Sequence, residues 1–181
     1  MRLFVAVDVP QDLKDAIEAD VVERLRGAAS GARWTRPEGR HLTLKFLGNV
    51  EGGRLREVAG VVAHVASRHH AFEASFDEIG GFPNVRRPRV LWIGIGAGSP
   101  ELERIAAGLE AGFVPLGFEQ EDRPFRGHLT LARFSRPGAI DPGGVAVPNE
   151  MFPVRELVLF ESKLHPKGAR YVSLERFPLL L

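Results

Sequence analysis

The chain has 181 residues, of which 44% are hydrophobic and 26% are charged, and its formal net charge is +1. This composition is typical of one globular domain, and the small net charge excludes a partner attracted by a strong overall field. The sequence contains no cysteine, which excludes disulfides, thiolate metal ligands and a cysteine nucleophile. It also contains no apolar run long enough to cross a bilayer, and we therefore expect a cytoplasmic protein with no membrane partner.

Hydrophobic periodicity divides the chain into strands and helices. In chain order it predicts a strand over 2–9, a helix over 11–26, a strand over 40–48, a helix over 52–68, strands over 71–83 and 89–96, a helix over 99–113, a strand over 126–134, a loop over 135–150 and a strand pair over 155–164 and 169–177. In the third helix, Ser99 is expected as the N-cap and Pro100 at the first helical position.

This order of elements predicts an α+β fold. Each half of the chain holds a helix, several strands and one strand with the letters HLTL, and no long linker separates the halves. We expect a single bilobal domain over residues 1–181, made of two pseudo-symmetric lobes of antiparallel sheet with helices packed outside.

The repeated letters HLTL occupy residues 41–44 and 128–131. On a strand, side chains two residues apart point the same way, so His41 shares a face with Thr43, and His128 with Thr130. The leucines take the opposite face and anchor each strand in the core. Thr35 is the one other threonine in the chain, so two of three threonines follow a histidine by two positions. This pairing favours function over two unrelated structural histidines.

The residue types of the repeat indicate phosphoryl chemistry. Imidazole titrates near neutral pH, so one histidine can accept a proton while the other donates one. A threonine hydroxyl can donate a hydrogen bond to a charged oxygen. Two such pairs on facing strands suit cleavage of a phosphodiester, with one imidazole activating water and the other protonating the leaving oxygen. This scheme requires no metal, no cofactor and no covalent intermediate.

Basic residues surround both copies of the repeat, which predicts an anionic substrate. They are Arg33, Arg36, Arg40 and Lys45 around the first copy, and Arg123, Arg126, Arg133 and Arg136 around the second.

Other site chemistries lack their motifs. No HExxH, GxSxG or phosphate-binding Walker loop is present, and the segment GIGAG at 94–98 lacks the third glycine of a dinucleotide-binding loop.

The chain resembles the 2H phosphoesterase superfamily through its paired HxTx motifs. The similarity extends over the segments RLFVAVDVP, HLTLKFLGNV, PRVLWIGI, GHLTLARF and LVLFESKL with GARYVSLERFPL, in this order. This form resembles the RNA 2′,3′-cyclic phosphodiesterases of the LigT/ThpR type, also called 2′-5′ RNA ligases.

The resemblance implies a central cleft lined by one motif strand from each lobe. It implies hydrolysis of an RNA 2′,3′-cyclic phosphate to a 2′-phosphate, with His41 as proton donor and His128 as proton acceptor. Thr43 and Thr130 would hold the phosphate oxygens. The reverse step, with a 5′-hydroxyl in place of water, would make a 2′-5′ linkage. We expect a monomer acting on RNA ends, with tRNA fragments among the candidate substrates.

Arg133 and Lys45 are the expected further substrate contacts. Arg133 occupies the family's basic position, but strict alternation places it on the leucine face, so it reaches the substrate only if the strand twists or bulges. Lys45 lies on the histidine face by the same alternation, toward the rim. Trp34, Phe82 and Tyr171 are candidates for stacking on a base.

Two alternatives to an RNA phosphodiesterase remain at this point. One is an RNA-binding module that keeps the fold without turnover. The other is the same chemistry on a small substrate such as an ADP-ribose cyclic phosphate.

Overall fold

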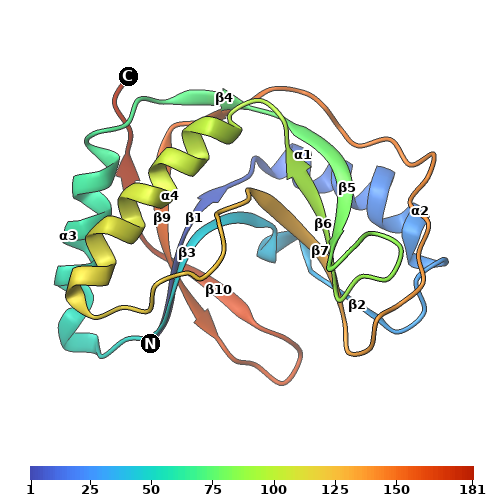
Figure 1. Cartoon of the computed structure of the whole chain (residues 1–181), viewed down its shortest axis with the longest axis horizontal. Coiled ribbons are helices and arrows are strands. Elements are labelled where there is room, and N and C mark those ends of the chain that lie inside the picture. Colours follow the sequence, from blue (N-terminus) through green and yellow to red (C-terminus); the bar gives the residue numbers. More distant parts are fainter.

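The computed structural model describes residues 1–181 and contains ten strands and four α-helices (Figure 1). In chain order these are β1 (Arg2–Asp8), α1 (Gln11–Ile17), the π-helical segment η1 (Glu18–Val22), α2 (Glu23–Arg26), β2 (Ala32–Trp34), the 3-10 turn η2 (Pro37–Gly39), β3 (His41–Asn49), the 3-10 turn η3 (Gly52–Arg54), α3 (Leu55–Ala66), β4 (Phe72–Ala74), β5 (Phe76–Phe82), β6 (Val90–Ile95), α4 (Ser99–Phe113), the 3-10 turn η4 (Val114–Leu116), β7 (His128–Phe134), β8 (Phe152–Val154), β9 (Glu156–Lys163) and β10 (Arg170–Pro178).

Two four-stranded antiparallel sheets form the two lobes. The first has the order β10-β9-β1-β3 and the second β2-β7-β6-β5, while β4 and β8 make a separate pair. Each HLTL motif therefore begins a strand of a different sheet, and the two motif strands β3 and β7 contact each other. Helices α3 and α4 pack together against the first sheet, as Figure 1 shows. The predicted α+β fold with two similar lobes is confirmed.

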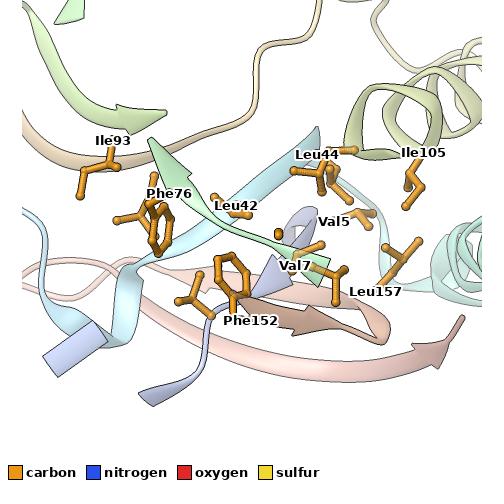
Figure 2. Packing of buried hydrophobic residues seen from close by; sticks show 14 of the residues in the cluster. Val5, Val7, Leu42, Leu44, Phe76, Ile93, Ile105, Phe152 and Leu157 are labelled. Carbon is orange, nitrogen blue, oxygen red and sulfur yellow. The ribbon is translucent and has the colours of Figure 1, made fainter. Parts of the chain in front are cut away.

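One hydrophobic cluster of 37 buried residues joins both lobes. Figure 2 shows Leu42 and Leu44 of β3 in the same packed region as Phe76 of β5 and Ile93 of β6. The leucines of both HLTL motifs are buried in this cluster, as the alternation predicts, so the histidines and threonines point to the opposite face of each sheet. We call that opposite face the motif face.

Both motif strands carry a β-bulge at the same position of the motif. In β3, the pairing with β1 passes from Thr43 to Lys45 and skips Leu44. In β7, the pairing with β6 passes from Thr130 to Ala132 and skips Leu131. An extra residue in one strand reverses the side-chain alternation beyond it. The residues directly after the bulge, Lys45 and Phe46 in β3 and Ala132 and Arg133 in β7, therefore lie on the face opposite to the one that strict alternation predicts.

Several element boundaries differ from the sequence-based predictions. The helix predicted over 11–26 is interrupted by the π-helical segment η1, and the short strands β2 and β8 were not predicted. Gly98, with φ of 83°, occupies the N-cap of α4, so the prediction of Ser99 at that position was wrong by one residue. Glycine adopts this left-handed conformation without the steric cost of a Cβ, which explains its position here. No helix combines the length and apolarity that a membrane span requires.

Candidate active site

His41 lies on the motif face of the first sheet, opposite Asp8 in the β1–β3 pairing, and Thr43 lies opposite Ala6. Directly opposed residues of antiparallel strands point to the same side of a sheet. His41 and Thr43 therefore share the motif face, as the sequence predicts. Thr43 is half-buried, whereas His41 is buried, with 8% of its surface exposed to solvent.

Three aromatic rings enclose the His41 imidazole. Its centroid lies 4.9 Å from that of Phe4 and 5.1 Å from that of Phe160, both in stacked geometry, and 5.0 Å from Tyr171, which meets it edge-on. These rings come from β1, β9 and β10, so the ring packing depends on the order of strands in the sheet. His41 Nδ1 is buried and has no hydrogen-bond partner. Packing, and not a hydrogen bond at this nitrogen, holds the ring in place.

Burial lowers the pKa of His41 from 6.5 to about 4. Desolvation is the largest cause, because the apolar rings stabilise a charged imidazolium poorly. The Lys14 ammonium lowers the pKa further, whereas the Asp8 carboxylate raises it. Lys14 Nζ lies 2.7 Å from Asp8 Oδ1, so the two opposing charges beside His41 form one ion pair. In the free protein, His41 is consequently neutral at pH 7.

His128 lies on the motif face of the second sheet, opposite Gly94 of β6, and Thr130 lies opposite Trp92. His128 Nδ1 is 2.8 Å from the carbonyl oxygen of Arg126. A carbonyl can only accept a hydrogen bond, so Nδ1 carries the proton and Nε2 of the neutral ring keeps a free lone pair. The geometry leaves Nε2 able to accept a proton.

Burial also lowers the pKa of His128, and it is the largest of four causes. The bond to the Arg126 carbonyl raises the pKa, while the charges of Arg133 and Arg126 lower it. Phe82 meets the ring edge-on with centroids 5.4 Å apart. The Arg126 guanidinium lies 4.8 Å from the ring centroid of Trp92, and this arginine is exposed to solvent.

Arg133 reaches the motif face because of the bulge at Leu131. It pairs with Val90, two positions from Trp92 on β6, so it shares the side of the sheet that carries Thr130 and His128. Its side chain is exposed. The bulge that the sequence analysis required for this arginine is present, and Arg133 is a cation on the same face as the second motif.

Lys45 does not lie on the motif face, contrary to the expectation from strict alternation. The bulge at Leu44 turns it to the opposite face, where it is 2% exposed. Its Nζ lies 2.8 Å from Glu110 of α4 and donates a hydrogen bond of 2.6 Å to the carbonyl of Glu119. Lys45 therefore attaches α4 to the back of β3. The prediction of a substrate contact was wrong because the bulge is invisible in the residue pattern.

Phe46 takes the place on the motif face that Lys45 was expected to hold. It lies opposite Phe4, its ring centroid 5.8 Å away, and remains 55% exposed. Strict alternation from His41 would place this phenylalanine on the leucine face, among the core residues. An exposed aromatic ring beside His41 and Thr43 is a candidate surface for stacking on a base.

The other predicted residues divide between the two faces. Tyr171 and Phe82 lie beside His41 and His128 respectively. Trp34 pairs with the buried Ala132, so it lies on the core face of the second sheet and does not share the face of His128. Arg40, one of the basic residues expected to attract an anion, is fully buried in an ion pair with Glu18.

A cavity of about 430 Å³ opens beside His128. This volume lies within the range of small-molecule sites. Its lining includes Trp92, Gly94, Arg126 and Gly127 next to the second motif, together with the acidic residues Asp77, Glu78 and Glu103. No three His, Cys, Asp or Glu side chains are grouped closely enough to hold a metal ion.

The model of the LigT-like phosphoesterase family matches residues 7–92 and 95–171. The chain therefore belongs to this family of 2H phosphoesterases, which confirms the resemblance drawn from the paired motifs.

Two relatives of similar length are RNA 2′,3′-cyclic phosphodiesterases. The protein from Archaeoglobus fulgidus is 36% identical over 98% of this chain and 99% of its own, and that from Thermus thermophilus is 35% identical over 99% and 90%. Among solved structures, TT0787 of Thermus thermophilus superposes with a TM-score of 0.81 at 32% identity, covering 99% of this chain and 98% of its own. Escherichia coli LigT complexed with 3′-AMP superposes with a TM-score of 0.77 at 26% identity, covering 98% and 97%.

Proposed function

We propose that this chain hydrolyses RNA 2′,3′-cyclic phosphodiester ends to 2′-phosphates by acid/base catalysis between two histidines. The observation that carries the proposal is the paired arrangement of the motifs. Two contacting strands each present one imidazole and one hydroxyl on the motif face. The relatives named RNA 2′,3′-cyclic phosphodiesterase cover almost the whole chain and support the same reaction.

In the proposed step, water attacks the phosphorus of the cyclic phosphate and loses its proton to Nε2 of His128. The bond from phosphorus to the 3′ oxygen breaks, and His41 donates a proton to that oxygen. The product is a 2′-phosphate monoester with a free 3′-hydroxyl. Solvent then takes the proton from His128, and His41, neutral after its donation, gains a proton again when the next substrate binds.

Thr43 and Thr130 donate hydrogen bonds to the non-bridging phosphate oxygens in this scheme. Arg133 supplies the positive charge that the developing dianion requires. The exposed Phe46 offers an aromatic surface to the base next to the cyclic phosphate.

The donor role of His41 requires that the substrate itself change the protonation of this residue. The free imidazole is neutral at pH 7, because its pKa is about 4. A phosphodiester anion bound against the ring favours the imidazolium and raises the pKa of His41 toward neutrality. The acid is therefore formed when the substrate is bound and is not present in the empty site.

The reverse reaction follows from the same groups. A 5′-hydroxyl in place of water would attack the cyclic phosphate, with His128 as base, and form a 2′-5′ linkage. We propose ligation as a side activity, because water at high concentration competes with the hydroxyl.

The test is hydrolysis of a short RNA ending in a 2′,3′-cyclic phosphate, in buffer containing EDTA, with the product identified by ³¹P NMR. We expect hydrolysis to continue in the chelator and to yield the 2′-phosphate alone. Activity that is lost in EDTA and returns with a divalent ion would contradict the two-histidine scheme. A 3′-phosphate product would show that the 2′ oxygen leaves in place of the 3′ oxygen, contrary to the proposed step.

The same assay separates the alternative functions. Tight binding of the RNA without product would identify an RNA-binding module. Faster turnover of an ADP-ribose cyclic phosphate than of the RNA would identify a small-molecule phosphodiesterase.

A further inference from the structure

A short crossover segment, residues 35–40, connects β2, the strand that pairs with the second motif strand β7, to the first motif strand β3. Thr35 directly follows β2 of the second sheet, and Arg40 directly precedes His41 of β3 in the first sheet. The segment includes the 3-10 turn η2, and the ring of Tyr171 packs against Gly39 so closely that a Cβ there would lie 2.8 Å from it. The segment thus packs against β10 of the first sheet.

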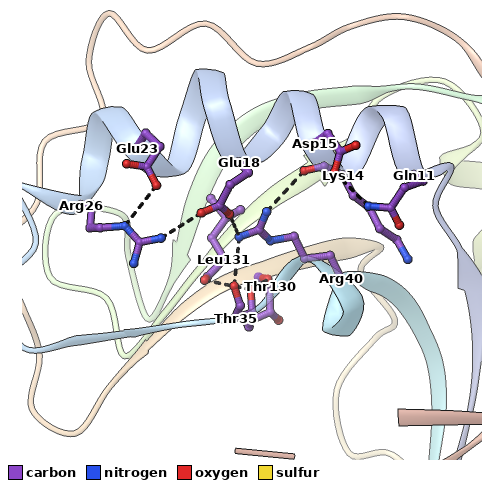
Figure 3. Close-up of polar contacts among 10 residues, drawn as sticks. All are labelled: Gln11, Lys14, Asp15, Glu18, Glu23, Arg26, Thr35, Arg40, Thr130 and Leu131. Carbon is purple, nitrogen blue, oxygen red and sulfur yellow. Dashed lines mark hydrogen bonds and ion pairs between the residues drawn. The ribbon is translucent and has the colours of Figure 1, made fainter. Parts of the chain in front are cut away.

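Thr35 binds the second motif at its bulge. Its backbone N–H donates to the Leu131 carbonyl at 2.8 Å. Its hydroxyl lies 2.8 Å from the Thr130 carbonyl and 3.0 Å from the Leu131 carbonyl, as Figure 3 shows. β2 pairs with β7 only as far as Trp34 and Ala132, so Thr35 meets β7 at the residue where its pairing with β6 is interrupted.

Arg40 connects this contact to the first motif. Its side chain is fully buried, and its Nη2 donates to the Thr35 carbonyl at 2.9 Å and to the carboxylate of Glu18 (Figure 3). Its Nη1 lies 3.4 Å from the Lys14 carbonyl. Glu18 begins the π-helical segment η1, where the widened turn departs from regular α-helix. A buried guanidinium paired in this way holds Thr35 at a defined position relative to His41.

We propose that Thr35 is a positioning residue for the phosphodiesterase site, acting through its hydroxyl. The hydroxyl stabilises the bulge at Leu131, and the bulge places Thr130 and Arg133 together on the motif face. Arg40, which binds the Thr35 carbonyl, directly precedes His41. Residues 35–40 therefore fix the position of the second motif relative to the first. The inference rests on the proposed function, because the reaction is what requires both motifs to meet one phosphate.

The first measurement compares Thr35→Val with Thr35→Ser. Valine keeps the branched shape and removes the donor, whereas serine keeps the donor. We expect Thr35→Val to lower kcat/KM for the cyclic phosphate by roughly 10- to 100-fold, because misplacement of about 1 Å costs rate on this scale. We expect Thr35→Ser to remain within about threefold of wild type. Ser67→Ala is the matched control, since the Ser67 hydroxyl also donates to a backbone carbonyl, that of His64, at the C-terminal end of α3.

The second measurement detects a displacement of Arg133 relative to His128 in the absence of substrate. Titration of the His128 imidazole by NMR senses the charges of Arg133 and Arg126, which both lower its pKa. If Thr35→Val releases the bulge, Arg133 moves away and the pKa of His128 rises relative to wild type. The wild-type hydrolysis rate tests the proposed function, whereas this titration does not depend on it, so the two ideas can fail separately.

The third measurement is a double-mutant cycle with Arg133→Ala. We expect Thr35→Val to cost less in this background than in wild type, because there is no longer an arginine to place. The inference requires all three results. It is overturned by kcat/KM of Thr35→Val within twofold of wild type, by an unchanged His128 titration, or by an equal fold-loss in both backgrounds.

Discussion

The burial of His41 predicts a specific loss of stability in acid. Its pKa is about 4 in the folded protein against 6.5 for a histidine exposed to water, so the unfolded chain binds the proton more readily. The contribution is fully present above pH 6.5 and is lost as the pH falls from 6.5 toward 4. Below the folded pKa, the loss amounts to about 3 kcal/mol, from 1.36 kcal/mol for each unit of pKa difference.

The assay is urea unfolding of wild type and His41→Gln at pH 7.5 and pH 4.5. Between these pH values, the free energy of unfolding of wild type should fall by about 2 to 3 kcal/mol more than that of the variant. Other groups that titrate contribute equally to both proteins, so the difference isolates His41. His64→Gln is the control for the substitution itself, because His64 is exposed on α3 and lies outside the ring packing around His41. Equal loss of stability in wild type and His41→Gln would refute the assignment of His41 as a buried neutral imidazole.

Three further predictions concern residues on the motif face and Lys45 on the opposite face of the first sheet. His41→Ala and His128→Ala should each lower kcat by roughly 10²- to 10⁴-fold in the cyclic phosphate assay with an unchanged circular dichroism spectrum, and a near-wild-type rate would remove that histidine from the mechanism. Lys45→Met should lower the midpoint of thermal unfolding while kcat/KM stays within about threefold of wild type, because Lys45 binds Glu110 behind the sheet. Phe46→Ala should raise KM for an oligonucleotide more than for a nucleoside 2′,3′-cyclic phosphate if the ring stacks on a neighbouring base; equal effects would restrict its contact to the terminal nucleotide.

The motif faces of the two sheets differ in character, although both motif strands begin with the same four residues, HLTL. Beyond the bulge, the first motif presents Phe46 and the second presents Arg133. The aromatic rings around His41 make the first face apolar, whereas arginine side chains lie beside His128. The repeated motif thus supplies equivalent proton and hydroxyl groups, and the residues that follow it supply the asymmetry that a directional reaction needs.

The sequence alone was sufficient to identify the paired histidines and threonines and their common face. Strand alternation is a local property, and the HLT positions precede the bulge in both strands, so His41, Thr43, His128 and Thr130 lie where alternation predicts. The helices and most strands were predictable for the same reason, because each depends on periodicity within one segment, and the two-lobed α+β fold followed from their order.

Only the tertiary structure decided what lies around these four residues. A β-bulge is a mismatch between two paired strands, so the letters of one strand cannot reveal it, and it exchanged the expected faces of Lys45, Phe46 and Arg133. The aromatic cage of His41 and the binding of Thr35 to the second motif join segments far apart in the chain. Such contacts depend on the order and register of strands in the sheets, which local periodicity does not determine.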